Sequence, residues 1–142
     1  MFLGEYVAQL GEKNRILLPK RLRDELVENI VYVTRGYEEC LILVDRQRWI
    51  NLIQEISKKP ILSIDVRDTK RYILGGAIEA ELDNQGRFVL TEELVNFAKL
   101  ESKIVFLGVG EWIEIWDYDK WTKKLEYLTK NVADLGERLS NL

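Results

Sequence analysis

The apolar and polar positions of this chain follow one series of elements twice. The first series predicts a strand, a polar turn, a second strand, a short helix, two further strands and a longer helix. These segments are residues 4–10, 11–14, 15–18, 21–26, 30–34 and 40–44, and the helix that follows Asp45 and runs to Ile56. Asp45 is the expected N-cap of that last helix, because a carboxylate can accept the free backbone N–H groups of a first turn.

The second series repeats the first step by step. Its strands are predicted at residues 77–82, 87–90, 103–107 and 112–116, and its turns at 83–86 and 108–110. Thr91 stands where the first series has Pro19, and both are residue types that start helices. Asp117 precedes a helix through Leu128, as Asp45 does in the first half.

Aligned with itself at an offset of 72 positions and without gaps, the chain shows identical residues along both halves. The coinciding pairs are Gly4 and Gly76, Ala8 and Ala80, Leu10 and Leu82, Arg15 and Arg87, Leu18 and Leu90, Leu22 and Leu94, Val33 and Val105, Gly36 and Gly108, Asp45 and Asp117, and Trp49 and Trp121. A repeat of this kind indicates one supersecondary unit made twice. Each copy alone would bury too little surface to be stable, so the copies are expected to share one core.

The predicted elements favour a mainly β fold with peripheral helices, of the α+β class. The short antiparallel strands suggest a small barrel or sandwich, in which a hairpin from each copy interleaves with the other and protects its edges. Between the copies, the break at residues 58–60 precedes a connecting helix predicted at 65–72. The tail at residues 131–142 fits either a last helix or a frayed end.

Composition argues against several classes of function. The chain has no histidine, and its single cysteine, Cys40, lies in an apolar run where a buried thiol is expected. It therefore lacks the commonest general base and the usual zinc ligands, so we expect no enzyme, no cofactor and no metal. No apolar run approaches the roughly 20 residues that span a bilayer, and the start lacks the features of a signal peptide. We expect a cytoplasmic protein with no membrane contact.

The net charge of −3 argues against a nucleic-acid surface that covers the whole protein. Residues 1–60 hold ten Lys and Arg against nine Asp and Glu, whereas residues 61–142 hold eleven against fifteen. Any such surface must therefore be a local patch.

Both copies keep an arginine at the end of the first turn, Arg15 and Arg87. In the second turn, Asp83 can hold backbone amides and Gly86 can supply a positive φ, so both shape the turn. Arg87 then either braces Asp83 or presents its planar guanidinium to phosphates or guanine edges. In the first turn the counterpart of Asp83 is Gly11, so Arg15 has no such acid to brace.

The motifs together resemble the MraZ family of bacterial transcriptional regulators, which is related to the AbrB-like swapped-hairpin proteins. In the first half the resemblance lies in residues 1–6, 13–15, 18–19, 33–36, 40–41 and Trp49. In the second half it lies in residues 75–77, 81–87, 109–110 and 114–116. The family pattern of an aspartate four residues before an arginine is kept in Asp83 and Arg87. The first copy departs from it, with Gly11 for the acid and Asn14 for the usual glycine.

This resemblance implies an internally duplicated swapped-hairpin, or double-split, β-barrel. It divides the chain into a first SpoVT-AbrB-like repeat at 5–47, connecting helices at 48–75, a second repeat at 76–119 and a C-terminal helix and tail at 120–142.

The resemblance also implies a function. Family members form closed rings, here expected to be octamers, and bind tandem operator repeats in double-stranded DNA upstream of their own gene, in the division and cell-wall gene cluster. The protein is then nucleoid-associated and regulates transcription. By carry-over the DNA-binding residues are Arg15, Arg87, Lys13, Asn14, Asn84 and Gln85.

Two further readings concern partners. An alternative function is a protein-interaction module of antitoxin-like type, whose arginine turns grip an acidic partner. Trp112 and Trp116 alternate with Ile113 and Ile115, so one set must face outward, and outward tryptophans suggest a subunit interface.

Overall fold

The elements of the computed structural model, which describes residues 1–142, occur in the predicted order. The first half contains β1 (Phe2–Gln9), η1 (Glu12–Asn14), β2 (Arg15–Leu17), α1 (Lys20–Arg23), β3 (Ile30–Arg35), β4 (Leu41–Asp45), α2 (Arg46–Ser57) and α3 (Ile64–Ile73). The second half contains β5 (Ile78–Glu81), β6 (Arg87–Val89), α4 (Glu92–Phe97), β7 (Lys103–Gly110), β8 (Ile113–Asp117), α5 (Tyr118–Lys130) and α6 (Val132–Ser140). The tail is therefore helical.

Three predicted helix starts are confirmed by side-chain hydrogen bonds. Asp45 accepts from the backbone N–H of Arg48, Thr91 from that of Leu94, and Asp117 from that of Lys120. Helix α1 is shorter than expected, and Pro19 lies at its N-cap position rather than inside it.

The strands form two antiparallel sheets that mix the halves. The larger has the order β1-β7-β8-β4-β3-β5, and the smaller is a ribbon of β2 and β6. The expected hairpins do not pair internally, because β1 lies on β7 and β2 on β6. The expected interleaving of the copies is confirmed, and the fold is a duplicated swapped-hairpin fold of mainly β type.

The registers place a pseudo-two-fold axis through both sheets. Ile16 pairs with Phe88 in the ribbon, and Ile42 pairs with Glu114 in the larger sheet. Each pair joins residues 72 positions apart, so equivalent residues of the two halves lie directly opposite one another. The chain has therefore built, within itself, the symmetry of a dimer.

The offset of 72 is wrong for the strands β3 and β7. Ala8 pairs with Ile104, while its counterpart Ala80 pairs with Val31, so Val31 and Ile104 are equivalent at an offset of 73. Val33 accordingly lies in the main core, whereas Val105 lies in a second cluster on the other face. A one-residue slip exchanges the faces of a strand, so the matches of Val33 with Val105 and of Gly36 with Gly108 are coincidental.

A single main core joins the halves, as predicted. It holds 19 buried residues, among them Ile16 and Leu18 from the first half and Phe88 and Leu90 from the second. Cys40 is fully buried outside this core, and burial is the main cause that raises the pKa of its thiol to about 12.

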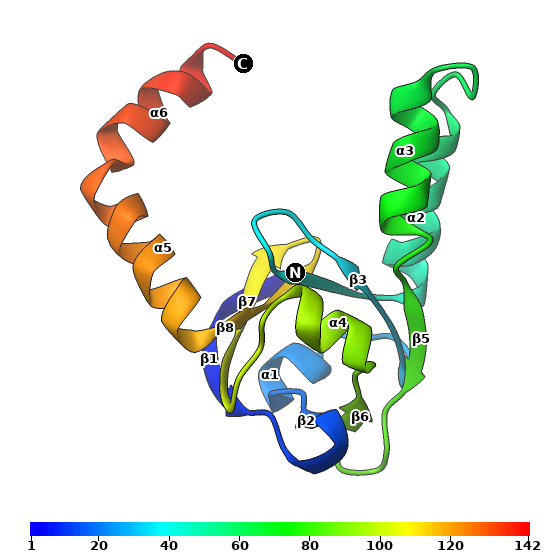
Figure 1. Cartoon of the computed structure of the whole chain (residues 1–142), viewed down its shortest axis with the longest axis vertical. Helices are drawn as coiled ribbons and strands as arrows, with labels where there is room; N and C mark the ends of the chain where they lie inside the picture. The colour runs from blue at the N-terminus through cyan, green and yellow to red at the C-terminus, as the bar shows by residue number, and fades with distance from the viewer.

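Four of the helices project from one end of the molecule. Helices α2 and α3 form one arm and α5 and α6 another, while the β2–β6 ribbon, α1 and α4 lie at the opposite end with both arginine turns (Figure 1). Trp49 stacks on Tyr32 at 5.2 Å between ring centroids, and Trp121 packs on Trp116 at 5.5 Å. These contacts fix the base of each arm on the sheet.

Candidate nucleic-acid interface

The β2–β6 ribbon brings both predicted arginines onto one surface. Ile16 and Phe88 point into the core and are 1% and 3% exposed. Because side chains alternate along a strand, the flanking residues Arg15 and Arg87 lie on the opposite, outward face.

Two apolar residues share this outward face. Arg15 pairs with Val89 and Leu17 with Arg87, so each arginine lies opposite an apolar side chain of the other half. Leu17 is 50% and Val89 49% exposed. The ribbon thus presents two cations at diagonal corners and two apolar side chains at the others.

The second turn is held from within by Asp83. One of its carboxylate oxygens accepts the backbone N–H groups of Gln85 and Arg87, both at 2.9 Å, and the other accepts Arg87 Nε at 2.8 Å. The backbone N–H of Arg87 is the main cause that lowers the pKa of Asp83 to about 2. The bracing reading is therefore correct, yet Arg87 stays 39% exposed and its two terminal nitrogens have no partner within the chain.

The first turn is held differently. Lys13 and Asn14 both adopt left-handed conformations, with φ of 57° and 58°. Asn14 Nδ2 donates to Glu92 Oε1 at 3.1 Å, from helix α4 of the other half. Arg15 is exposed and forms no ion pair within the chain.

Backbone hydrogen bonds nevertheless place the two turns symmetrically. Leu90 N–H donates to Asn14 O and Leu18 N–H donates to Gly86 O, each at 2.9 Å. A hollow of about 320 Å³ lies beside the ribbon and is lined by both arginines together with Ala80, Glu81, Asp83, Phe88 and Val89.

The other predicted contact residues lie on the same two turns. Lys13, Asn84 and Gln85 are exposed, and Asn14 is half-buried against α4. Gly86 has the expected positive φ, of 88°, but is buried.

Sequence reasoning missed Arg23. It lies on α1, and its Nη1 donates to the backbone carbonyl of Gln85, 62 positions away. The sequence signals only a basic short helix, with nothing to indicate which turn it reaches.

Charge separates the two halves of this surface. Residues 11–25 carry five basic side chains against three acidic ones, whereas residues 81–93 carry Arg87 alone against four acidic ones. The excess of basic side chains on this surface therefore lies in the first half, while the second half carries an excess of acidic ones.

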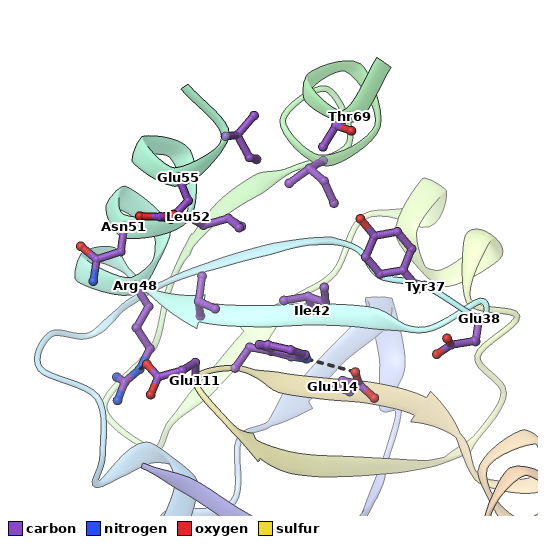
Figure 2. Close-up of a pocket in the computed structure, with 14 residues that line it drawn as sticks. Tyr37, Glu38, Ile42, Arg48, Asn51, Leu52, Glu55, Thr69, Glu111 and Glu114 are labelled. Atoms are coloured by element: carbon purple, nitrogen blue, oxygen red, sulfur yellow. Dashed lines mark hydrogen bonds and ion pairs between the residues drawn. The ribbon is translucent and has the colours of Figure 1, made fainter. Parts of the chain in front are cut away.

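A larger cavity than this hollow lies elsewhere, at the base of the α2–α3 arm (Figure 2). It encloses about 640 Å³ and has Glu38, Glu55, Glu111 and Glu114 against Arg48 in its lining. Trp112 forms one wall, 39% exposed, and its indole N–H donates to Glu114. Its acidic lining is unsuited to phosphate. The alternation made Trp112 and Trp116 together the candidates for an outward set. Trp112 is exposed, as that prediction requires, but the prediction is wrong for Trp116, which is 4% exposed and covered by α5.

No group of three or more His, Cys, Asp or Glu side chains is arranged to hold a metal ion. None of the helices combines the length and apolarity that a membrane span requires.

Comparison with known proteins identifies the relatives of this chain. The family model described as "MraZ protein, putative antitoxin-like" matches it twice, at residues 1–72 and 73–140. The transcriptional regulator MraZ of Roseiflexus castenholzii is 35% identical over 142 residues, covering 100% of this chain and 99% of that protein. The same holds for the transcriptional regulator MraZ of Syntrophomonas wolfei, and that of Clostridium tetani is 35% identical over 144 residues with the same coverage. A solution structure of PHS018 from Pyrococcus horikoshii has a TM-score of 0.33 at 15% identity, covering 81% of this chain and 88% of that one, which is too weak to bear on the fold.

Proposed function

The chain belongs to the MraZ family, and from that premise we propose that it is a sequence-specific DNA-binding transcriptional regulator. It binds tandem operator repeats upstream of its own gene, in the division and cell-wall gene cluster, and acts in the cytoplasm at the nucleoid. Its relatives are named as transcriptional regulators, which is not a class of enzyme.

The observation that carries the proposal is the outward face of the β2–β6 ribbon, where Arg15 and Arg87 stand together. A two-stranded ribbon fits the major groove, and a guanidinium can donate two parallel hydrogen bonds to a guanine edge. Each such contact discriminates against a wrong base by about 1–3 kcal/mol. Lys13, Asn14, Asn84 and Gln85 surround these arginines and supply phosphate and neighbouring base contacts.

One ribbon is too weak for a genomic site, so the proposal includes a closed ring of subunits, with an octamer as the expected form. Several linked contacts on tandem repeats raise apparent affinity by roughly 10²–10⁴. Two features support self-association. Helices α5 and α6 form a projecting arm with no buried residue, in which Val132 is 65% and Leu139 68% exposed (Figure 1), and Trp112 is exposed in the cavity of Figure 2.

The test is fluorescence anisotropy with the DNA immediately upstream of the gene, against a scrambled duplex of equal length. We expect specific binding that weakens steeply with salt, because phosphate contacts release counterions. The Arg15→Ala/Arg87→Ala double variant should retain its fold and oligomer but bind both duplexes equally. Arg71→Ala, an exposed arginine on the distant arm, is the charge-matched control. Retained specificity in the double variant would overturn the assignment of the site.

A protein-interaction module is the second candidate, because the family model is described as antitoxin-like and Leu17 and Val89 are half exposed beside the arginines. Apolar side chains flanked by cations suit an acidic protein partner. Stoichiometric capture of such a partner, abolished by the same double variant and accompanied by no operator binding, would favour this candidate.

A further inference from the structure

Helix α1 of the first half reaches the arginine turn of the second half. Arg23 Nη1 donates to the carbonyl oxygen of Gln85, and its guanidinium covers Gly86, which is buried beneath it. A Cβ on Gly86 would lie 2.7 Å from Arg23 Cζ and 2.8 Å from Arg23 Cδ, so no larger residue fits there without displacing Arg23.

This contact completes the support of the turn that carries Arg87. On one side, Asp83 accepts hydrogen bonds from the backbone N–H groups of Gln85 and Arg87. On the other side, Arg23 donates one to the backbone carbonyl of Gln85. The backbone N–H and the backbone carbonyl of Gln85 are therefore both hydrogen-bonded to side chains. A turn held at both ends loses less conformational freedom on binding, which improves affinity without a new contact.

The other turn has no equivalent. At the offset of 72, the position of Arg23 is taken by Val95, which is 8% exposed in the main core. The first turn is tied to the other half by Asn14 and Glu92 instead. The brace is thus a feature of the Arg87 turn alone.

We propose that Arg23 is a positioning residue: it holds the turn of residues 83–87 so that Arg87 faces the DNA. Arg23 itself makes no contact with the DNA. This inference rests on the proposed DNA-binding function.

The experiment compares Arg23→Ala and Arg23→Lys with Arg21→Ala. Arg21 is the matched control, because it lies two residues away on α1, carries the same charge and is exposed. In the free protein, amide hydrogen exchange followed by NMR should be about tenfold faster at Gln85 and Arg87 in Arg23→Ala, unchanged in Arg21→Ala, and intermediate in Arg23→Lys. A melting curve of each variant establishes that the fold is retained.

Operator binding supplies the readout that a merely structural role would not move. Arg23→Ala should weaken specific binding about tenfold while leaving the salt dependence of binding unchanged, since no phosphate contact is lost. In an Arg87→Ala background the same substitution should have no further effect on specific binding, because a positioning residue acts through Arg87.

Two results would overturn the inference. Unchanged exchange in Arg23→Ala would show that the contact does not hold the turn. A salt slope reduced by about one, with additive loss in the Arg87→Ala background, would make Arg23 a phosphate contact. If wild-type protein bound no operator although exchange responded to Arg23→Ala, the proposed function would fail and the brace itself would stand.

Discussion

The two arginine turns occupy equivalent places about the pseudo-two-fold axis, yet different chemistry holds each one. The second turn has a carboxylate, a glycine and the guanidinium of Arg23. The first has Gly11 in place of the acid, two non-glycine residues at positive φ, and a tie to Glu92. Equivalent backbone hydrogen bonds from Leu18 and Leu90 survive in both.

This difference shows which part of the motif the fold itself requires. The backbone bonds hold the turns in the interleaved core, so they are kept in both halves. The side-chain supports have diverged, which leaves Arg87 preorganised and Arg15 freer, in a more basic setting. A duplicated chain can differentiate in this way, whereas a dimer of identical chains cannot.

The largest expected effect separates the two arginines themselves. Arg87→Ala should reduce operator affinity at least about a hundredfold and relax specificity, because it removes a preorganised bidentate donor from every engaged subunit, at about 1–3 kcal/mol each. Arg15→Ala should reduce sequence specificity less than Arg87→Ala does, but it should reduce the salt dependence of operator binding more, because Arg15 lies in the more basic half. Anisotropy titrations at several salt concentrations measure both quantities, and equal profiles for the two variants would break the distinction.

Next in size is the effect of backbone conformation. Gly86→Ala should lower the free energy of unfolding by about 1–3 kcal/mol, because the residue has a φ of 88° and its Cβ would overlap the Arg23 side chain. Asn14→Ala should lower the free energy of unfolding by less, on the order of 1 kcal/mol. The left-handed backbone at this position already carries a residue with a Cβ, so alanine adds no new atom there. Urea unfolding of both variants supplies the comparison. A larger loss at Asn14 would mean that the first turn is the more constrained.

A smaller effect should appear in acid. The folded-state pKa of Asp83 is lowered from 3.8 to about 2, so its contribution to stability is present above about pH 4 and is lost as the pH falls towards 2. The stabilities of wild type and Asp83→Asn should therefore differ near neutral pH and converge in acid. Urea unfolding from pH 7 to pH 2.5 gives this difference, and one that is constant with pH would contradict the role of the carboxylate. Gly11→Ala, in the half without the acid, should show no such convergence.

The smallest expected effect concerns the tie of the first turn. Glu92→Ala should reduce stability by about 0.5–1 kcal/mol through loss of its exposed hydrogen bond to Asn14. A double-mutant cycle with Asn14→Ala isolates the pair, and Glu93→Ala, adjacent on α4, is the matched control. A coupling near zero would indicate that the backbone bond from Leu90 alone holds the first turn.

Much of this site was predictable from the sequence. The offset of 72 identified Arg15 and Arg87 as counterparts, and the residues at 83–87 predicted an aspartate-capped turn with a glycine at positive φ. These are local properties, since a turn depends on a few neighbouring residues. Arg23 was not predictable, because its bond to Gln85 depends on the packing of α1 against a segment about sixty positions further on.

The sequence by itself determined the elements before the tail, their order, the helix starts at Asp45, Thr91 and Asp117, and the two arginine turns, because periodicity and capping act over a few residues. Only the tertiary structure decided that β2 pairs with β6, that Val31 rather than Tyr32 is the counterpart of Ile104, and that both arginines share one ribbon. Alternation tells which face of a strand is apolar but not which strand will lie beside it. That choice follows from burying the apolar faces of both halves in one core.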